Sequence, residues 1–332
     1  LWGIFTFQIV QGAVDDSERT NDLMKEVRRT APASPDFLEI ELASLALDNA
    51  AGFYSGDFAR QFRSIAGIRE RYDIATHAPL IPSYGLDIFA TAQLFEPHAR
   101  AIVGELDRVE PLIAEADAHQ DLLSIPLMRP YAAVWGGIPF FYLGQHDRAL
   151  KRIGDGARMS EEQSGVFWHL GGLVWHAVVD LDRGATPERV EALRTVLGHM
   201  RTLGVGIGIP YWSARLALGE AALGNVEEAL TLAASAEEVT LASGAGCWRA
   251  EIQRARGRIL AASGDLAAAT AALTRAADTA RTQNARLWLL RALTDLAALA
   301  PTDARLAERA ALADTLPDAY LEAPLSQPQT TA

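Results

Sequence analysis

The chain has 332 residues, a formal net charge of −12 and a single cysteine, Cys247. The acidic balance leaves no basic surface for a phosphate backbone, so we expect no nucleic-acid partner. One cysteine excludes a disulfide framework and a multi-thiolate metal site, and it fits a reducing, cytoplasmic compartment. No apolar run reaches the roughly 18 to 20 residues that span a bilayer, so we expect no membrane segment.

The composition favours helix throughout, because Ala, Leu and Arg dominate and alternating apolar runs are rare. We predict helix for about three quarters of the residues and essentially no strand. The chain begins at Leu1, inside an apolar helix and without the basic flank of a signal peptide. We interpret it as a piece of a longer polypeptide or as a chain whose start is missing.

Turn glycines recur at a fixed interval along the chain. Four of them, each between two amphipathic stretches, are spaced by 40 residues: Gly144, Gly184, Gly224 and Gly264. Three earlier ones continue the series at intervals of 44 and 48: Gly12, Gly56 and Gly104. A period in this range indicates a solenoid of stacked helical hairpins.

Small residues recur with the same period, where two helices must cross closely. Seven positions before the turn glycines stand Gly137, Ala177, Ala217 and Gly257, and five positions after them stand Ala149, Arg189, Ala229 and Ala269. Helices that cross at about 8 to 10 Å tolerate only small side chains at the contact. The order Gly257, Gly264, Ala269, Leu273, Ala276 is the tetratricopeptide (TPR) pattern, with Asp265 capping the second helix. Arg189 departs from the pattern, so we expect its hairpin to splay.

The predicted fold is an all-α, TPR-like right-handed superhelix of about eight hairpins. We place them at 1–31, 35–72, 86–119, 127–160, 163–203, 208–243, 246–283 and 285–315. Residues 316–332 carry three prolines and read as a C-terminal tail. Residues 73–85 and 203–210 form longer connections, and Pro97 and Pro111 predict a kink or a break in the third hairpin.

The stretch after the second hairpin carries the most specific sequence signal. Its polar and aromatic positions are Tyr72, Asp73, His77, Tyr84, Gly85 and Asp87. With the chain's opening and its closing repeats, they resemble the C-terminal TPR region of bacterial ATPase-coupled adenylate/guanylate cyclases and related signal-transduction ATPases. In this family a Tyr-Asp-x-x-x-His segment leads to Tyr-Gly-x-Asp. For His77, Tyr84 and Asp87 two roles stay open: pinning the array, with Asp87 capping the next helix, or direct ligand contact.

The resemblance implies a regulatory function. Such an array follows an ATPase or cyclase module in the same parent chain and senses a protein or a small-molecule effector. The chain itself shows no Walker motif, no cyclase metal-binding aspartate pair and no catalytic constellation, so we expect no catalysis, cofactor or metal site here. The alternative is a free-standing TPR scaffold that binds peptides of partner proteins.

Aromatic and histidine residues gather in the middle repeats. The candidate ligand-binding residues are Trp135, Trp168, His169, Trp175, His176, Tyr211 and Trp212. The first helix of each TPR hairpin lines the concave face, so these side chains should share one groove, beside Gly171 and Gly172. Tryptophans that recur with the repeat also serve as packing between repeats, and glycines also allow close helix packing, so both interpretations stay open. The seven-residue spacing of the two histidines does not suit zinc.

Overall fold

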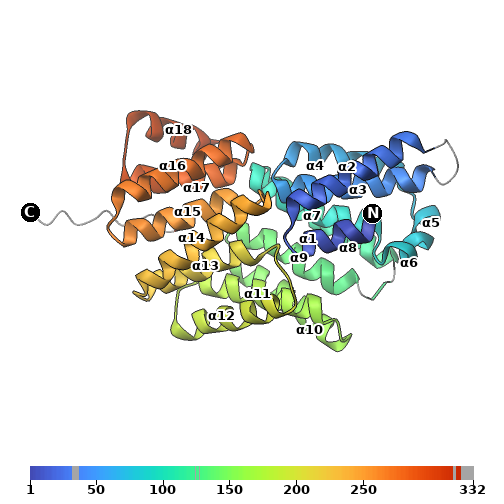
Figure 1. Ribbon diagram of the computed structural model, residues 1–332, viewed down its shortest axis with the longest axis horizontal. Coiled ribbons are helices and arrows are strands. Elements are labelled where there is room, and N and C mark those ends of the chain that lie inside the picture. The colour runs from blue at the N-terminus through green and yellow to red at the C-terminus, as the bar shows by residue number, and fades with distance from the viewer. Residues whose placement is uncertain (32–36, 124, 127, 317–318, 323–332) are drawn as a thin grey trace, which may run out of the picture.

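The computed structural model describes residues 1–31, 37–123, 125–126, 128–316 and 319–322 (Figure 1). In these ranges the regular elements are all helices, and no strand occurs. The all-α prediction is therefore confirmed. None of the helices in the described ranges combines the length and the hydrophobicity needed to cross a bilayer.

The long helices pack as successive pairs. The pairs are α1 (Trp2–Val10) with α2 (Val14–Thr30), α3 (Phe37–Ser55) with α4 (Phe58–Arg71), α7 (Ile88–Val103) with α8 (Val109–Leu123), α9 (Met128–Tyr142) with α10 (His146–Glu162), α11 (Val166–Asp182) with α12 (Pro187–Thr202), α13 (Ile209–Ala222) with α14 (Val226–Ser243), α15 (Arg249–Ala262) with α16 (Leu266–Thr282), and α17 (Arg286–Leu299) with α18 (Asp303–Asp314). The expected connection at 73–85 contains the short helices α5 (Ile74–His77), η1 (Ala78–Leu80) and α6 (Ile81–Tyr84), and η2 (Leu106–Arg108) precedes α8.

Small residues lie at the helix crossings, as the period predicts. A Cβ added to Gly257 would stand 2.6 Å from Leu273 Cγ, so α15 and α16 approach closely only because that side chain is missing. At the equivalent Gly137 an added Cβ would stand 2.5 Å from Ile153 Cγ1. Arg189 differs, since its side chain extends to Asp180, with an Nε–Oδ2 distance of 2.9 Å, and stays partly exposed.

The third hairpin is more regular than its prolines suggest. Pro97 lies inside α7, which runs without interruption from Ile88 to Val103, so the helix does not break there, and a kink at Pro97 stays a prediction. Pro111 lies in the first turn of α8, where the backbone N–H has no intrahelical acceptor in any case. The missing donor therefore costs nothing at Pro111.

Backbone contacts between distant turns close the superhelix on itself. Gly206 N donates to Val10 O at 2.8 Å, and Gly246 N donates to Tyr54 O at 2.7 Å. A Cβ on either glycine would overlap the facing backbone, so both positions require glycine. Figure 1 shows the result, with the blue N-terminal helices beside the orange helices near the C-terminus. The connection 203–210 is thus bound to the first hairpin.

The chain after α18 is partly packed. Leu316 is 3% exposed, and its side chain lies against Gly104 and Arg286. Residues 319–322 also pack against the repeats, through Tyr320 and Glu322. The sequence had assigned these residues to a tail. Residues 317–318 and 323–332, which complete that tail, lie outside the described residues.

The crossing geometry predicts unequal effects for the same substitution in two repeats. Ala269→Leu inserts bulk at a fully buried crossing, and such overpacking costs about 1 to 3 kcal/mol of unfolding free energy. Arg189→Leu removes a partly exposed ion pair and should change the unfolding free energy by less than about 0.5 kcal/mol. Urea unfolding midpoints of the two variants measure the difference. Equal shifts would contradict the repeat alignment.

Candidate functional site

An apolar cavity of about 370 Å³ lies inside the superhelix. Most of its wall comes from the first helices of successive hairpins, namely α1, α3, α7, α9, α11 and α13, and the rest comes from Met200 of α12 and from connecting segments. This is the inner face that TPR arrays present to ligands. The volume falls in the range of about 300 to 1,000 Å³ that is typical of small-molecule sites.

Tryptophan dominates the cavity wall. Six of the chain's seven tryptophans line it: Trp2, Trp135, Trp168, Trp175, Trp212 and Trp248. Four of these belong to the predicted groove set, and the structure brings these four together. Trp2 and Trp248 were missed, because they lie near the ends of the array in sequence and reach the same wall only when the superhelix closes.

The other three residues of the predicted groove set lie outside the lining. His169 Nδ1 lies 3.1 Å from Ala157 O of α10, and His176 faces Gly154 of the same helix. Burial lowers the pKa of His176. The two histidines therefore share one face of α11, but that face packs on α10. Tyr211 is buried behind the wall and stacks on Trp248, with ring centroids 5.3 Å apart. A ligand role for these three residues stays a prediction.

Two glycines shape the space between the rings. Gly171 lines the cavity, and an added Cβ would find nothing nearer than Trp168 Cε3 at 4.0 Å. Gly172, one residue on, faces Ala157 of α10, where an added Cβ would stand 2.7 Å from the alanine Cβ. Each of the two interpretations of the glycine pair therefore fits one of the two glycines. Gly172 permits helix packing, whereas Gly171 leaves open space beside Trp168.

Two indole N–H groups at the wall, those of Trp135 and Trp212, have no hydrogen-bond acceptor among the described residues. Trp212 is 4% exposed, and its Nε1–H finds no hydrogen-bond acceptor among the described residues. A buried donor without a partner costs free energy comparable to a lost hydrogen bond. By contrast, Trp248 Nε1 donates to Tyr142 Oη at 2.8 Å. The Trp212 indole therefore offers a donor that a carbonyl or hydroxyl oxygen of a ligand can satisfy.

A buried histidine supports the cavity from behind. Pro139 lies inside α9 and has no N–H, so the carbonyl of Trp135, four residues earlier, lacks its helical donor. His98 of α7 replaces that donor, with Nε2 2.9 Å from Trp135 O. Burial lowers the pKa of His98 to about 3, and the hydrogen bond to Trp135 offsets only part of this effect. The imidazole therefore stays neutral at physiological pH.

The loop with the family resemblance contacts the cavity wall at Trp2. Trp2 Nε1 donates to Tyr84 O at 3.1 Å, and the two rings meet edge to face with centroids 5.1 Å apart. Tyr84 Oη donates to Glu39 Oε1 at 2.7 Å, which ties the loop to α3. His77 is buried, and its Nδ1 lies 2.7 Å from Asp73 O within the loop itself. Tyr84 thus reaches the site indirectly, through Trp2.

Asp87 occupies the helix-capping position that the sequence suggested. Its Oδ1 accepts from Ala90 N at 2.7 Å, at the start of α7, and its Oδ2 accepts from Tyr72 Oη at 2.7 Å. Burial on its own would raise the pKa of the Asp87 carboxyl, but hydrogen bonds from His119, Ala90 and Tyr72 outweigh burial and lower it. The observed contacts of Asp87 are those of an anchor for the loop.

The described ranges hold no cluster of metal-ligating side chains, and the cysteine is buried. There, no group of three or more His, Cys, Asp or Glu residues is placed to hold a metal ion. Cys247 is buried, and burial raises the pKa of its thiol well above the ordinary value, so the thiolate is disfavoured.

Comparison with solved structures identifies the fold class. No protein-family model matches the sequence, and a search of curated proteins gives no significant match. A structure described as a Rap protein complexed with Competence and Sporulation Factor aligns with a TM-score of 0.64 at 10% identity, over 96% of this chain and 86% of that chain. The apo form of RapI aligns with a TM-score of 0.45 at 9% identity, over 95% and 85%.

The first of these likenesses shows a shared fold. The chain is a TPR-like helical-repeat superhelix, as the sequence predicted. The comparisons do not bear on the resemblance to cyclase-associated repeats, which stays a prediction.

The buried histidine predicts a pH dependence of stability. The folded-state pKa of His98 is about 3, below the value of about 6.5 for an unfolded chain. Below pH ~6.5 the unfolded chain takes up a proton that the folded chain refuses, so stability falls by about 1.4 kcal/mol per pH unit down to pH ~3. His98→Gln keeps an N–H donor for Trp135 but does not titrate. Urea unfolding at several pH values should therefore give a shallower slope for this variant.

The same substitution at His199, which is exposed on α12, is the control. His199→Gln should keep the wild-type slope. A slope that His98→Gln leaves unchanged would contradict the role assigned to His98.

Proposed function

We propose that this chain is a non-catalytic regulatory domain whose tryptophan-lined cavity binds an apolar effector, either a small molecule or the apolar side chains of a peptide. The observation that carries the proposal is the cavity itself, about 370 Å³ with an almost entirely apolar wall and the free indole N–H of Trp212. Exclusion of water from such a wall drives the binding of apolar groups, and the few polar groups orient the ligand.

The fold supports a role in binding. A Rap protein with this fold was crystallised with Competence and Sporulation Factor, which shows that this architecture accommodates a ligand. In this chain the inner face is formed mainly by the first helices of the hairpins. On this view the array converts ligand binding into a change in how the hairpins pack, since the cavity wall draws on hairpins from both halves of the chain.

The finer assignment rests on the sequence resemblance. We propose that the domain belongs to a bacterial cytoplasmic signalling protein and follows an ATPase or nucleotide-cyclase module in the same parent chain. A reading frame upstream of Leu1 that encodes such a module would support this assignment. A complete short gene would favour the free-standing scaffold instead.

Filling the cavity tests the binding proposal. Gly171→Leu places a side chain in the open space beside Trp168, and it should also favour the helix by up to about 1 kcal/mol relative to glycine. Titration with the apolar probe N-phenylnaphthylamine, followed by quenching of tryptophan emission, should show at least about tenfold weaker binding than in the wild type.

Gly198→Leu is the matched control, because Gly198 lies on α12 with nothing near an added Cβ. This variant should bind the probe like the wild type. If both variants bind the probe equally well, the cavity is not the binding site.

A further inference from the structure

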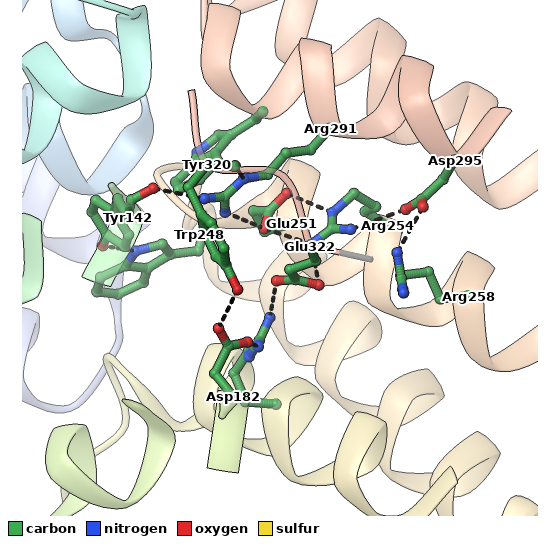
Figure 2. A network of polar contacts seen from close by, with 12 residues as sticks. Tyr142, Asp182, Trp248, Glu251, Arg254, Arg258, Arg291, Asp295, Tyr320 and Glu322 are labelled. Carbon is green, nitrogen blue, oxygen red and sulfur yellow. Dashed lines mark hydrogen bonds and ion pairs between the residues drawn. The ribbon is translucent and has the colours of Figure 1, made fainter. Parts of the chain in front are cut away.

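A short segment of the chain lies among the repeats as an extended peptide would. After α18 the chain returns, and Tyr320 contacts three different hairpins, two of them through the hydrogen bonds of Figure 2. Its Oη donates to Asp182 Oδ2 at 3.1 Å, and its carbonyl accepts from Arg291 Nε at 3.1 Å. The ring rests on the turn at Gly144, where a side chain would occupy the same space. The contacts of Tyr320 therefore combine main chain, hydroxyl and ring.

Glu322 places a carboxylate between two arginines from different helices. Its Oε1 accepts from Arg215 Nη1 of α13 at 2.8 Å, and its Oε2 pairs with Arg254 Nη2 of α15 at 3.0 Å. Arg215 is 7% exposed and Arg254 is 2% exposed. Burial on its own would raise the pKa of the Glu322 carboxyl, but the guanidinium groups around it outweigh burial and hold the pKa well below its usual value.

The arginines of the cluster are also held in place by residues of the repeats. Arg254 is held by Glu251, with an Nε–Oε1 distance of 2.8 Å, and by Asp295, with an Nη1–Oδ2 distance of 2.9 Å. Arg291 is held by Glu251 Oε2 at 3.1 Å and by the carbonyl of Tyr142 at 2.8 Å. These partners come from the repeats, so the guanidinium groups have fixed positions. Preorganised donors of this kind bind carboxylates with little ordering cost.

Glu322 joins a network of oppositely charged side chains from the repeats. In the described part of the chain the cluster joins four guanidinium groups to four carboxylates: Arg215, Arg254, Arg258 and Arg291, with Asp182, Glu251, Asp295 and Glu322. Glu322 is the one carboxylate that does not come from a repeat helix. Its departure leaves Arg215 and Arg254 each with one carboxylate partner fewer in a buried site. Because the loss of a partner is costly for a buried charge, another carboxylate is favoured at the same place.

We infer that the Arg215–Arg254–Arg291 cluster, with Asp182, is a binding site for an acidic peptide of the form Tyr-x-Glu, and that residues Tyr320–Glu322 fill this site in cis. Asp182 accepts from the tyrosine hydroxyl, Arg291 binds the tyrosine carbonyl, and Arg215 with Arg254 binds the glutamate. A peptide of another molecule that carries the same groups competes with the chain's own segment. The inference does not depend on what the tryptophan-lined cavity binds.

Anisotropy of a labelled peptide tests the site. The peptide copies residues 316–325, Leu-Pro-Asp-Ala-Tyr-Leu-Glu-Ala-Pro-Leu, and a second peptide carries Gln in place of the glutamate. The intact chain with Tyr320→Ala and Glu322→Gln loses the side-chain contacts of the segment, while no residue of a repeat helix is changed. It should bind the Glu peptide at least about tenfold more tightly than the wild-type chain does, and the Gln peptide at least about tenfold more weakly than the Glu peptide.

Two arginine variants, made in the opened chain, separate the site from general charge. Arg215→Gln should abolish peptide binding. Arg158→Gln is the matched control, because Arg158 is exposed on α10, and it should leave binding unchanged. Gly171→Leu should also leave peptide binding unchanged. The peptide-site inference and the cavity proposal can therefore be refuted independently of each other. Equal affinity for the Glu and Gln peptides, or no gain in affinity in the opened chain, would overturn the inference.

Refolding provides the readout if the opened chain does not fold alone. The chain is refolded with and without an excess of the Glu peptide, and helical circular dichroism is measured. Recovery of the helical signal with the Glu peptide, but not with the Gln peptide, supports a site that accepts the peptide in trans. Absence of recovery with either peptide means that residues 319–322 are a fixed part of the fold, and the inference is wrong.

Discussion

Contacts between backbone turns that are far apart in sequence close the superhelix, and the interior depends on this closure. The turn of the first hairpin meets the connection between the fifth and sixth, and the turn of the second meets the connection between the sixth and seventh. Gly206 and Gly246 make the approach possible, because any side chain there would overlap the opposing backbone. Closure after so few hairpins leaves a narrow interior, which large side chains can nearly fill.

Two chemically different regions share that interior. The tryptophan-lined cavity lies among the first helices of hairpins one to six, and the arginine cluster lies among α11, α13, α15 and α17. One pair of residues connects the two regions. Trp248 lines the cavity and donates to Tyr142 Oη, while the carbonyl of Tyr142 accepts from Arg291 (Figure 2). A hydrogen-bonded path thus joins the two regions.

The buried ion pairs contribute more to the specific recognition of a carboxylate than to the stability of the fold. Removing Arg254 or Glu251 from water carries a large desolvation cost, which their mutual attraction roughly repays. What the cluster provides is a fixed arrangement of donors that recognises a carboxylate at a defined point. Similarly, His98 of α7 donates to the backbone carbonyl of α9 that Pro139 leaves without a helical donor. The hydrogen bond missing within α9 is therefore replaced by one from α7.

The sequence alone determined the repeat architecture, since its causes act within one period. Gly257 opposite Leu273, and Asp265 at the start of α16, are contacts within a single hairpin. Only part of the cavity lining could be predicted from the sequence. The four tryptophans of the middle repeats share one wall, as the 3.6-residue helical period indicates, whereas the face of α11 that carries His169 packs on α10.

Only the tertiary structure decided where the superhelix closes, because its pitch is the sum of small rotations between hairpins, which no local pattern encodes. Closure is what brings Trp2 and Trp248 to one cavity and Glu322 to Arg215, a residue 107 positions earlier in the chain.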